Sequence, residues 1–292
     1  MDDRAPMGWF RGLLAAIGAK FIHLLIRVLG REVKFEDAPW LAGPRGGPYI
    51  GDRPYEDTAK AEGLSVERNA SSGGLLSDFS SLAHPGFDPD KVQREVRRFY
   101  EETARYRMDV WASSRFPANL ALWLLVTTIS RKVNQLNFPL RVLDTAKGMD
   151  SEIVLLRAAD GSLRYAGWYR KLSESQRVIY TGFYMTTTVP RTGHRCVKVV
   201  FPMPNGNATV ILRPGVTDQG DFSLSSAGDG FGDAGFYRVQ EVAPGRFTVW
   251  QIRSLKEHFR VYVDDKGVLR CDHNIRFLGL PVLSLHYRIE EK

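Results

Sequence analysis

The chain has 292 residues, and its hydrophobic content of 43% and charged content of 25% are those of a globular protein and exclude a disordered one. The net charge of +7 suits an anionic membrane surface or a nucleic acid, but it does not select either of them. Cys196 and Cys271 are the only cysteines, and no cysteine–histidine cluster has zinc spacing, so we expect two reduced, buried thiols and no metal centre.

Residues 1–35 predict an amphipathic N-terminal helix. Its apolar side chains fall on one face, and residues 8–31 contain basic side chains but no acidic ones. The longest uncharged run, residues 12–19, is too short to span a bilayer, and the acidic start MDDRAP does not fit a secretory signal. The segment therefore predicts either a helix lying on an anionic membrane surface or a helix packed on the body of the protein.

Residues 36–89 are rich in glycine and proline, which excludes long regular elements. Large apolar residues recur in the same stretch, among them Trp40, Tyr55 and Phe79, and are too numerous for a free linker. We therefore expect an ordered segment that wraps the protein, called the strap below, with a short helix over residues 55–62.

Residues 90–148 are predicted to be helical. Asp88 and Pro89 are a favoured N-cap and first helical residue, and the pattern that follows predicts one helix as far as Trp111. The uncharged stretch 116–130 favours a second, buried helix over an interfacial one. Basic residues in this region alternate with acidic ones at pairing distance, as in Arg98 and Glu102, so nucleic-acid binding is not expected.

Residues 149–292 read as consecutive strands separated by turn signals such as Asp160-Gly161 and Lys266-Gly267. Connections this short allow only antiparallel neighbours, and closure or strong curvature would protect the sheet edges. The sequence therefore predicts an α+β protein in which N-terminal helices and the strap precede a C-terminal antiparallel β-barrel or strongly curved sheet.

The stretch FPMPNGNATVILRP, residues 201–214, places two prolines and Asn205-Gly206 inside a predicted strand. Asn-Gly favours a two-residue type I′ hairpin, because both central positions of that turn need a positive φ. Proline cannot donate to a strand ladder, so the prolines belong at an edge. The stretch predicts a corner of the sheet, and its exposed amides leave a ligand-binding role open.

Gly230, Gly232 and Gly235 form a GxGxxG sequence. The dinucleotide-binding version must open a helix, whereas a strand follows here, so we expect a flexible rim loop that could cover a ligand. No P-loop, GxSxG or HExxH motif occurs, and no cofactor is predicted.

Two other sets of residues are candidates for chemistry. Alternation places Glu257 and His273 on the apolar faces of their strands. The two are candidates for an acid/base pair within a cavity, and the alternatives are a surface glutamate at the start of its strand for Glu257 and a core histidine for His273. Aromatic residues cluster between positions 165 and 184, and the hydroxyls of Tyr169, Tyr180 and Tyr184 are candidates for polar ligand contacts. A well-packed core is the alternative for this aromatic cluster.

The stretches FYEETARYRMDVW, GMDSEIVLLR, VVFPMPNGNATVILRP and GFGDAGFY resemble a group of uncharacterised bacterial proteins. The resemblance extends from about Trp40 to the C-terminus and implies no activity and no catalytic residues. The late strand pattern is also similar in outline to lipocalin-like barrels, which concerns architecture and not function.

Together these patterns predict binding or handling of a hydrophobic small molecule, such as a lipid or isoprenoid, in the cavity of the sheet near a membrane surface. One alternative is an enzyme that uses Glu257 and His273 for acid/base chemistry on a hydrophobic substrate. The other is a structural protein with a filled core. We expect a cytoplasmic protein. Residues 8–31 suggest the alternative that it associates peripherally with the inner face of the membrane.

Overall fold

The computed structural model describes residues 26, 28–114, 135, 148–174 and 176–292. The predicted helix over residues 116–130 and residues 1–25 of the predicted N-terminal helix lie outside the described residues. Residues 26, 28 and 29 are helical, but the prediction of a helix as far as residue 35 was wrong, because residues 31–33 form strand β1 and pair with residues 247–249. None of the helices that are described is both long and apolar enough to span a bilayer.

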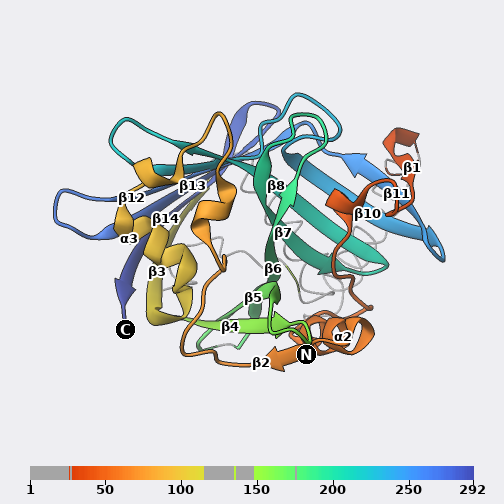
Figure 1. Ribbon diagram of the computed structural model, residues 1–292, viewed down its shortest axis with the longest axis horizontal. Helices are drawn as coiled ribbons and strands as arrows, with labels where there is room; N and C mark the ends of the chain where they lie inside the picture. The colour runs from red at the N-terminus through yellow and green to blue at the C-terminus, as the bar shows by residue number, and fades with distance from the viewer. Residues whose placement is uncertain (1–25, 27, 115–134, 136–147, 175) are drawn as a thin grey trace, which may run out of the picture.

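The described residues form one 14-stranded antiparallel sheet and a few short helical elements (Figure 1). The strands are β1 (Arg31–Val33), β2 (Ser65–Glu67), β3 (Tyr106–Ser114), β4 (Met149–Arg157), β5 (Leu163–Leu172), β6 (Val178–Thr188), β7 (Arg195–Met203), β8 (Gly206–Val216), β9 (Phe222–Ser225), β10 (Gly235–Ala243), β11 (Arg246–Gln251), β12 (Leu255–Val263), β13 (Leu269–Phe277) and β14 (Leu280–Glu291). The helices are α2 (Arg53–Glu62) and α3 (Arg94–Glu101), and the 3-10 turns are η1 (Pro39–Leu41), η2 (Phe79–Leu82), η3 (Pro89–Lys91) and η4 (Thr103–Arg105).

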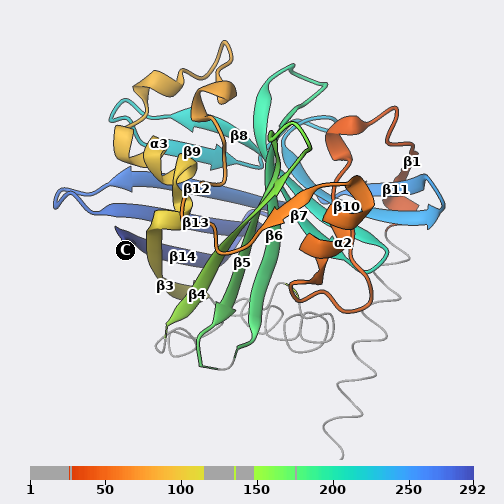
Figure 2. The same ribbon diagram turned by 60° about the horizontal axis from the view of Figure 1, so that its bottom comes forward.

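Strand β8 divides the sheet into two arms and a branch. On one edge β8 pairs with β7, and β2, β4, β5 and β6 complete this first arm. On the other edge, residues 206–211 of β8 pair with β10 and residues 213–216 pair with β9. Strand β9 leads to the second arm, β12, β13, β14 and β3, whereas β10 leads to a branch of β11 and β1 (Figure 2).

The two arms curve toward each other and share a core on the concave face. Its residues include Trp168 of β5, Val199 of β7, Cys271 of β13 and Ile289 of β14. Register shifts within the ladders, for example between Arg170 and Lys171, bend and twist the strands that contain them. The predicted strongly curved antiparallel sheet is confirmed, but the barrel alternative is not, because the end strands β2 and β3 do not pair in the part of the chain that is described.

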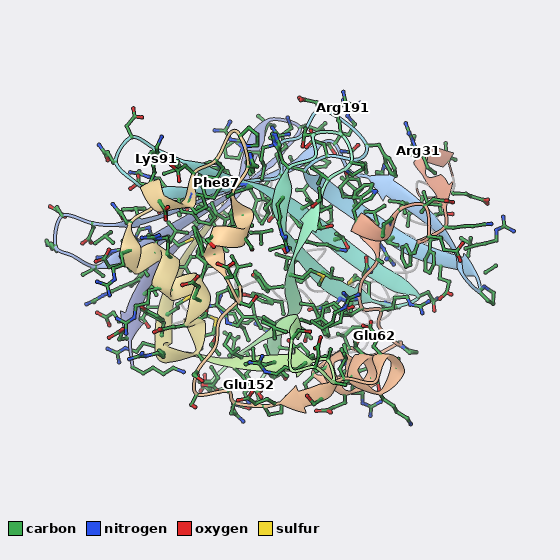
Figure 3. All side chains as sticks on the ribbon, viewed as in Figure 1. Arg31, Glu62, Phe87, Lys91, Glu152 and Arg191 are labelled. Atoms are coloured by element: carbon green, nitrogen blue, oxygen red, sulfur yellow. The ribbon has the colours of Figure 1, made fainter. Side chains whose placement is uncertain are left out.

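The strap covers both faces of the sheet. Tyr55 of α2 is buried on the convex face against Phe183, whereas Phe79 and Phe87 pack against Phe222 on the concave face. Figure 3 shows Phe87 directed into the protein and Lys91, which is exposed, at its edge. The predicted short helix is confirmed as α2 (Arg53–Glu62).

The helix predicted from Asp88 to Trp111 is much shorter in the structure. The Asp88 carboxylate does accept a hydrogen bond from the Asp90 amide, but it caps only the turn η3, and α3 ends at Glu101. Residues 106–114 form β3, in which Tyr106, Met108, Val110 and Ala112 are buried and alternate with exposed residues. The helical prediction was wrong here because this period of two favours a strand, and pairing with β14 satisfies its backbone.

The predicted hairpin between β7 and β8 forms, but its turn lies one residue earlier than expected. Met203 pairs with Gly206, so the two central residues are Pro204 and Asn205. Proline followed by a residue of positive φ, here 55° at Asn205, is typical of a type II turn and not of type I′. Gly206 has a different role, because a Cβ at this position would lie 2.1 Å from the Val239 carbonyl oxygen of β10.

Gly206→Ala should destabilise the protein by roughly 2–4 kcal/mol, because overpacking against β10 adds to the cost of a positive φ. Gly161→Ala is the matched control: its φ is also positive, at 83°, but a Cβ there meets nothing within 4 Å. The control should lose only about 1–2 kcal/mol. Urea denaturation of both variants measures the difference, and equal losses would contradict the close approach of β10.

Candidate functional site

A buried arginine lies at the centre of the concave face. Arg170 follows Trp168 by two residues on β5, so alternation directs both side chains to this face, and Arg170 is only 3% exposed. Its guanidinium carbon lies 5.1 Å from the ring centroid of Trp168, 5.7 Å from that of Tyr180 and 5.4 Å from that of Tyr287. Because Tyr287 belongs to β14, Arg170 connects the two arms of the sheet.

No carboxylate of the described residues forms an ion pair with Arg170, and its Nε and Nη2 atoms have no hydrogen-bond partner there. Burial alone would lower the pKa of Arg170, but interactions with the Tyr180 and Tyr287 hydroxyls outweigh burial and raise it. The guanidinium therefore remains charged. A buried charge without a counter-charge is costly, which makes Arg170 a candidate ligand anchor.

Three tyrosines surround this guanidinium. Burial raises the pKa of Tyr180, Tyr184 and Tyr287, so their phenols are protonated near neutral pH and can donate hydrogen bonds. The sequence predicted ligand contacts for Tyr180 and Tyr184, and the structure places both beside Arg170. Tyr169 is on the opposite, convex face, where its ring lies 6.5 Å from that of Tyr55. It is therefore not part of this cluster.

Glu257 and His273 are close together on the concave face of the second arm. Alternation predicted that each lies on the apolar face of its strand, but not that they approach each other. The His273 Nε2 atom lies 3.4 Å from a carboxylate oxygen of Glu257, and both side chains are largely buried. The imidazole stacks on Phe259 with a centroid distance of 3.8 Å. The angle of the contact is unsuitable for a hydrogen bond, and Nε2 has no hydrogen-bond partner among the described residues. The pair has the composition of an acid/base dyad.

The Arg170 cluster and the Glu257–His273 pair belong to the same surface. On β13, Cys271 faces Tyr287 of β14, and His273, two residues further along, faces Leu285. Since side chains two residues apart share a face, Tyr287 and His273 both point into the concavity. One elongated ligand could therefore contact both groups.

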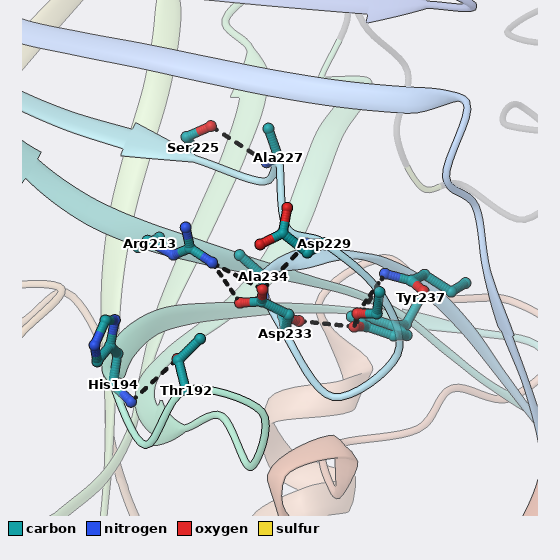
Figure 4. Close-up of polar contacts among 11 residues, drawn as sticks. Thr192, His194, Arg213, Ser225, Ala227, Asp229, Asp233, Ala234 and Tyr237 are labelled. Atoms are coloured by element: carbon teal, nitrogen blue, oxygen red, sulfur yellow. Dashed lines mark hydrogen bonds and ion pairs between the residues drawn. The ribbon is translucent and has the colours of Figure 1, made fainter.

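The loop that contains Gly230, Gly232 and Gly235 is held by a buried carboxylate (Figure 4). Asp233 is 0% exposed, and Arg213 donates to its two oxygens at 2.7 and 2.8 Å. The amides of Asp229 and Ala234 donate to the same carboxylate, and the Tyr237 hydroxyl donates to the Asp233 carbonyl. These contacts hold the loop in place. The sequence analysis predicted a flexible loop because it missed the role of Asp233.

Gly235 begins strand β10 and not a helix, so the GxGxxG sequence lacks the helix N-terminus that dinucleotide binding requires. Ligand binding by the three glycines stays a prediction. No group of three or more histidine, cysteine, aspartate or glutamate residues suited to a metal occurs in the part of the chain that the structure describes. Cys196 and Cys271 are both buried and unbonded.

Asp233→Asn should destabilise the protein by roughly 2–4 kcal/mol, because it leaves the Arg213 charge without its partner. Burial would raise the pKa of Asp233, but the hydrogen bond from Arg213 and two backbone amides outweigh burial and lower it. The contribution of the ionised Asp233 carboxylate to stability is therefore fully present above the unfolded-state pKa of about 4. It is lost as the pH falls through the lower folded-state pKa.

Urea denaturation at neutral and acidic pH measures the Asp233 contribution. Asp229→Asn is the control, because Asp229 is an exposed carboxylate in the same loop. Equal stability of the two variants at neutral pH would contradict the anchoring role of Asp233.

A cleft of about 1050 Å³ lies where the strap crosses the first arm. Residues of α2, of the strap and of β5–β7 line it, and Glu62, labelled in Figure 3, is at its edge. Tyr184 also lines the cleft and interacts with Tyr180, which contacts Arg170. The cleft therefore opens next to the Arg170 cluster.

Lys198 of β7 lines the same cleft but was missed by the sequence analysis. It is 2% exposed, and its Nζ atom donates to the Ala42 carbonyl of the strap. Burial, assisted by the positive charge of Arg164, lowers the pKa of Lys198 to about 7. The available signal was a single lysine in the apolar strand RCVKVVF, which we did not interpret as buried.

Lys198→Met should change how stability depends on pH. Because the folded-state pKa is below that of the unfolded chain, the unfolded protein binds more protons between about pH 7 and pH 10, and wild-type stability rises across this window. The variant lacks this contribution, so wild-type stability minus variant stability should increase by up to about 1.4 kcal/mol per pH unit. Urea denaturation across the window tests this, and a constant difference would exclude a depressed pKa.

The chain is similar to a protein of Bacillus subtilis (strain 168) named "Uncharacterized membrane protein YndJ", with 25% identity over 236 residues. The similar region covers 77% of this chain and 40% of that protein, so the chain spans less than half the length of this relative. No family model and no solved structure matches the chain. The resemblance to uncharacterised bacterial proteins is confirmed at this level.

Proposed function

We propose that the protein binds a hydrophobic small molecule with an acidic group on the concave face of the sheet, and that Arg170 is the anchor for this group. The observation that carries the proposal is a buried, charged guanidinium with aromatic neighbours and no ion pair among the described residues. The class of ligand follows from the surroundings, which are apolar apart from hydroxyls and the Glu257–His273 pair.

An anionic ligand would satisfy the groups that the protein leaves unpaired. Nε and Nη2 of an arginine lie on one edge of the guanidinium plane and can donate together to a carboxylate or phosphate. The neutral phenols of Tyr180 and Tyr287 can add further donors. The rings of Trp168 and Phe259 offer apolar area to an acyl or isoprenoid chain.

The cleft next to Tyr184 provides room and access. Its volume of about 1050 Å³ is at the upper end of the range of small-molecule sites. Tyr184 is half-buried, lines the cleft and interacts with Arg170, so rotation of this side chain would open the concave face to a ligand. A structural protein with a filled core would need neither the cleft nor a charged core residue.

We place this binding at or near a membrane surface. Residues 8–31 supply basic and apolar side chains without acidic ones, and the Bacillus subtilis relative is named a membrane protein. A cytoplasmic protein bound peripherally to the inner face of the membrane would meet amphipathic ligands there.

Catalysis on the bound molecule is the second candidate function. It is favoured by the 3.4 Å approach of the His273 imidazole to the Glu257 carboxylate within the same concavity. His273 could accept a proton from the ligand, while Glu257 stabilises the resulting imidazolium. His273→Gln should then retain the ligand but lose turnover by roughly 10²–10⁴-fold.

Arg170→Met should abolish ligand retention and yet stabilise the free protein. Replacement of a buried charge by an apolar side chain of similar length is often neutral or stabilising, by about 1–4 kcal/mol. The same change removes charge-assisted hydrogen bonds, which should weaken binding of a fatty acid probe by roughly 10–100-fold. Native mass spectrometry of co-purifying molecules, probe titration and urea denaturation measure these effects.

Lys171→Met is the matched control for Arg170→Met. It removes a positive charge from the next residue of β5, on the alternate face, and should leave probe binding unchanged. A stable Arg170→Met protein that binds the probe as well as wild type would reject the anchor. An unfolded Arg170→Met protein would indicate a structural role for the guanidinium and would equally reject the proposal.

A further inference from the structure

The hairpin that joins β13 to β14 exposes a group of large apolar side chains. Phe277 is 45% exposed, Leu278 71% and Leu280 68%. Most of the large hydrophobic residues of the described chain are buried, so three exposed ones within four positions form a distinct apolar tip. The apolar tip is defined here as residues 277–280.

The backbone makes leucine an unfavourable choice at the apex. Leu278 has a φ of 51° and Gly279 a φ of 81°, as expected for a type I′ turn. Asparagine, aspartate or glycine is preferred at the first of these positions, whereas a leucine there is strained. Because the Leu278 side chain is exposed, the strain is not explained by packing within the described part of the protein. Strain of this kind is often found at functional positions.

Basic residues surround the apolar tip. Arg253, Lys256 and Arg276 are exposed, and Lys256 is paired with Arg276 across the β12–β13 ladder. The Leu278 amide donates to the Ser254 carbonyl at 2.8 Å, which fixes the turn before β12 against the tip. Residues 250–256 and 274–289 contain no acidic residue, and none of the three cations has an ion pair among the described residues. Arg253, Lys256 and Arg276, called the basic collar below, lie at the same end of the second arm as the tip.

We propose that the apolar tip inserts into the interfacial region of an anionic bilayer, with Arg253, Lys256 and Arg276 contacting the lipid headgroups. A narrow hairpin apex suits insertion between lipids, whereas a stable protein interface needs about 800 Å² on each partner. The collar carries the charge opposite to that of anionic lipids, and each basic residue near such a surface should raise vesicle affinity by roughly fivefold.

This contact is independent of Arg170, but it has a consequence for the proposed ligand site and, in that respect only, rests on the proposed function. Phe277 pairs with Leu255, and two residues further into the sheet Ile275 pairs with Glu257. An inserted tip would therefore bring the Glu257 end of the concave face close to the bilayer. An amphipathic ligand could then pass between membrane and protein without crossing water.

The experiment uses the full chain with Leu278→Cys labelled by an environment-sensitive fluorophore. Cys196 and Cys271 are buried, so the new thiol is the accessible one among the described residues. The emission should increase with phosphatidylcholine vesicles that contain phosphatidylserine, and lipid-borne quenchers should reduce it. Pure phosphatidylcholine vesicles should produce little change.

Two further variants make the test specific. The triple variant Arg253→Gln, Lys256→Gln and Arg276→Gln should weaken vesicle affinity by roughly 100-fold. Lys266 lies in the exposed turn between β12 and β13, at the opposite end of the strands. Lys266→Cys, labelled in the same way, should therefore show no change in emission when anionic vesicles are added. Arg170→Met should respond as wild type does, which separates this inference from the ligand site.

Three results would overturn the inference. The protein could sediment with anionic vesicles while the Leu278 label stays silent, which would assign membrane binding to another segment such as residues 8–31. The emission could rise with protein concentration in the absence of lipid, which would identify a second copy of the chain as the partner. The protein could also fail to bind either kind of vesicle.

Discussion

The division of β8 between two partners is the constraint on which the rest of the structure depends. Residues 206–211 of this strand pair with β10, but residues 213–216 pair with β9, so the sheet separates at Leu212. The Arg213 side chain reaches the buried Asp233 carboxylate in the loop that leads into β10. This ion pair ties the loop before β10 to the end of β8 that pairs with β9. The arms can then face each other across one concave core, which brings Tyr287 to Arg170.

The sequence predicted the local features of this fold better than its long-range contacts. Alternation was sufficient to assign the strands of residues 149–292 and to place Glu257 and His273 each on the apolar face of its own strand, because side-chain direction follows from the period of two. It could not show that β14 returns beside β5 in space. The segment from Tyr106 to Trp111 was assigned to a helix because charged residues in a strand that is exposed on one side also fit a helical pattern.

Burial of a cation was the feature that the sequence did not reveal. Arg170 and Lys198 lie in strands that also contain other basic residues, and long basic side chains commonly reach solvent from such positions. Here the strap covers Lys198, and the opposite arm covers Arg170. Both coverings come from residues more than a hundred positions away, so no local pattern could predict them.

The free-energy cost of burying a positive charge is offset differently at Lys198 and at Arg170. The pKa of Lys198 falls to about 7, so a large fraction of the molecules can hold this amine neutral at physiological pH. An arginine cannot lose its proton in this range, and the pKa of Arg170 is raised further by its tyrosine neighbours. The convex side therefore needs no external counter-charge. The concave side does, and because the guanidinium nitrogens that lack partners lie among aromatic rings, the counter-charge that fits is the acidic group of an otherwise apolar molecule.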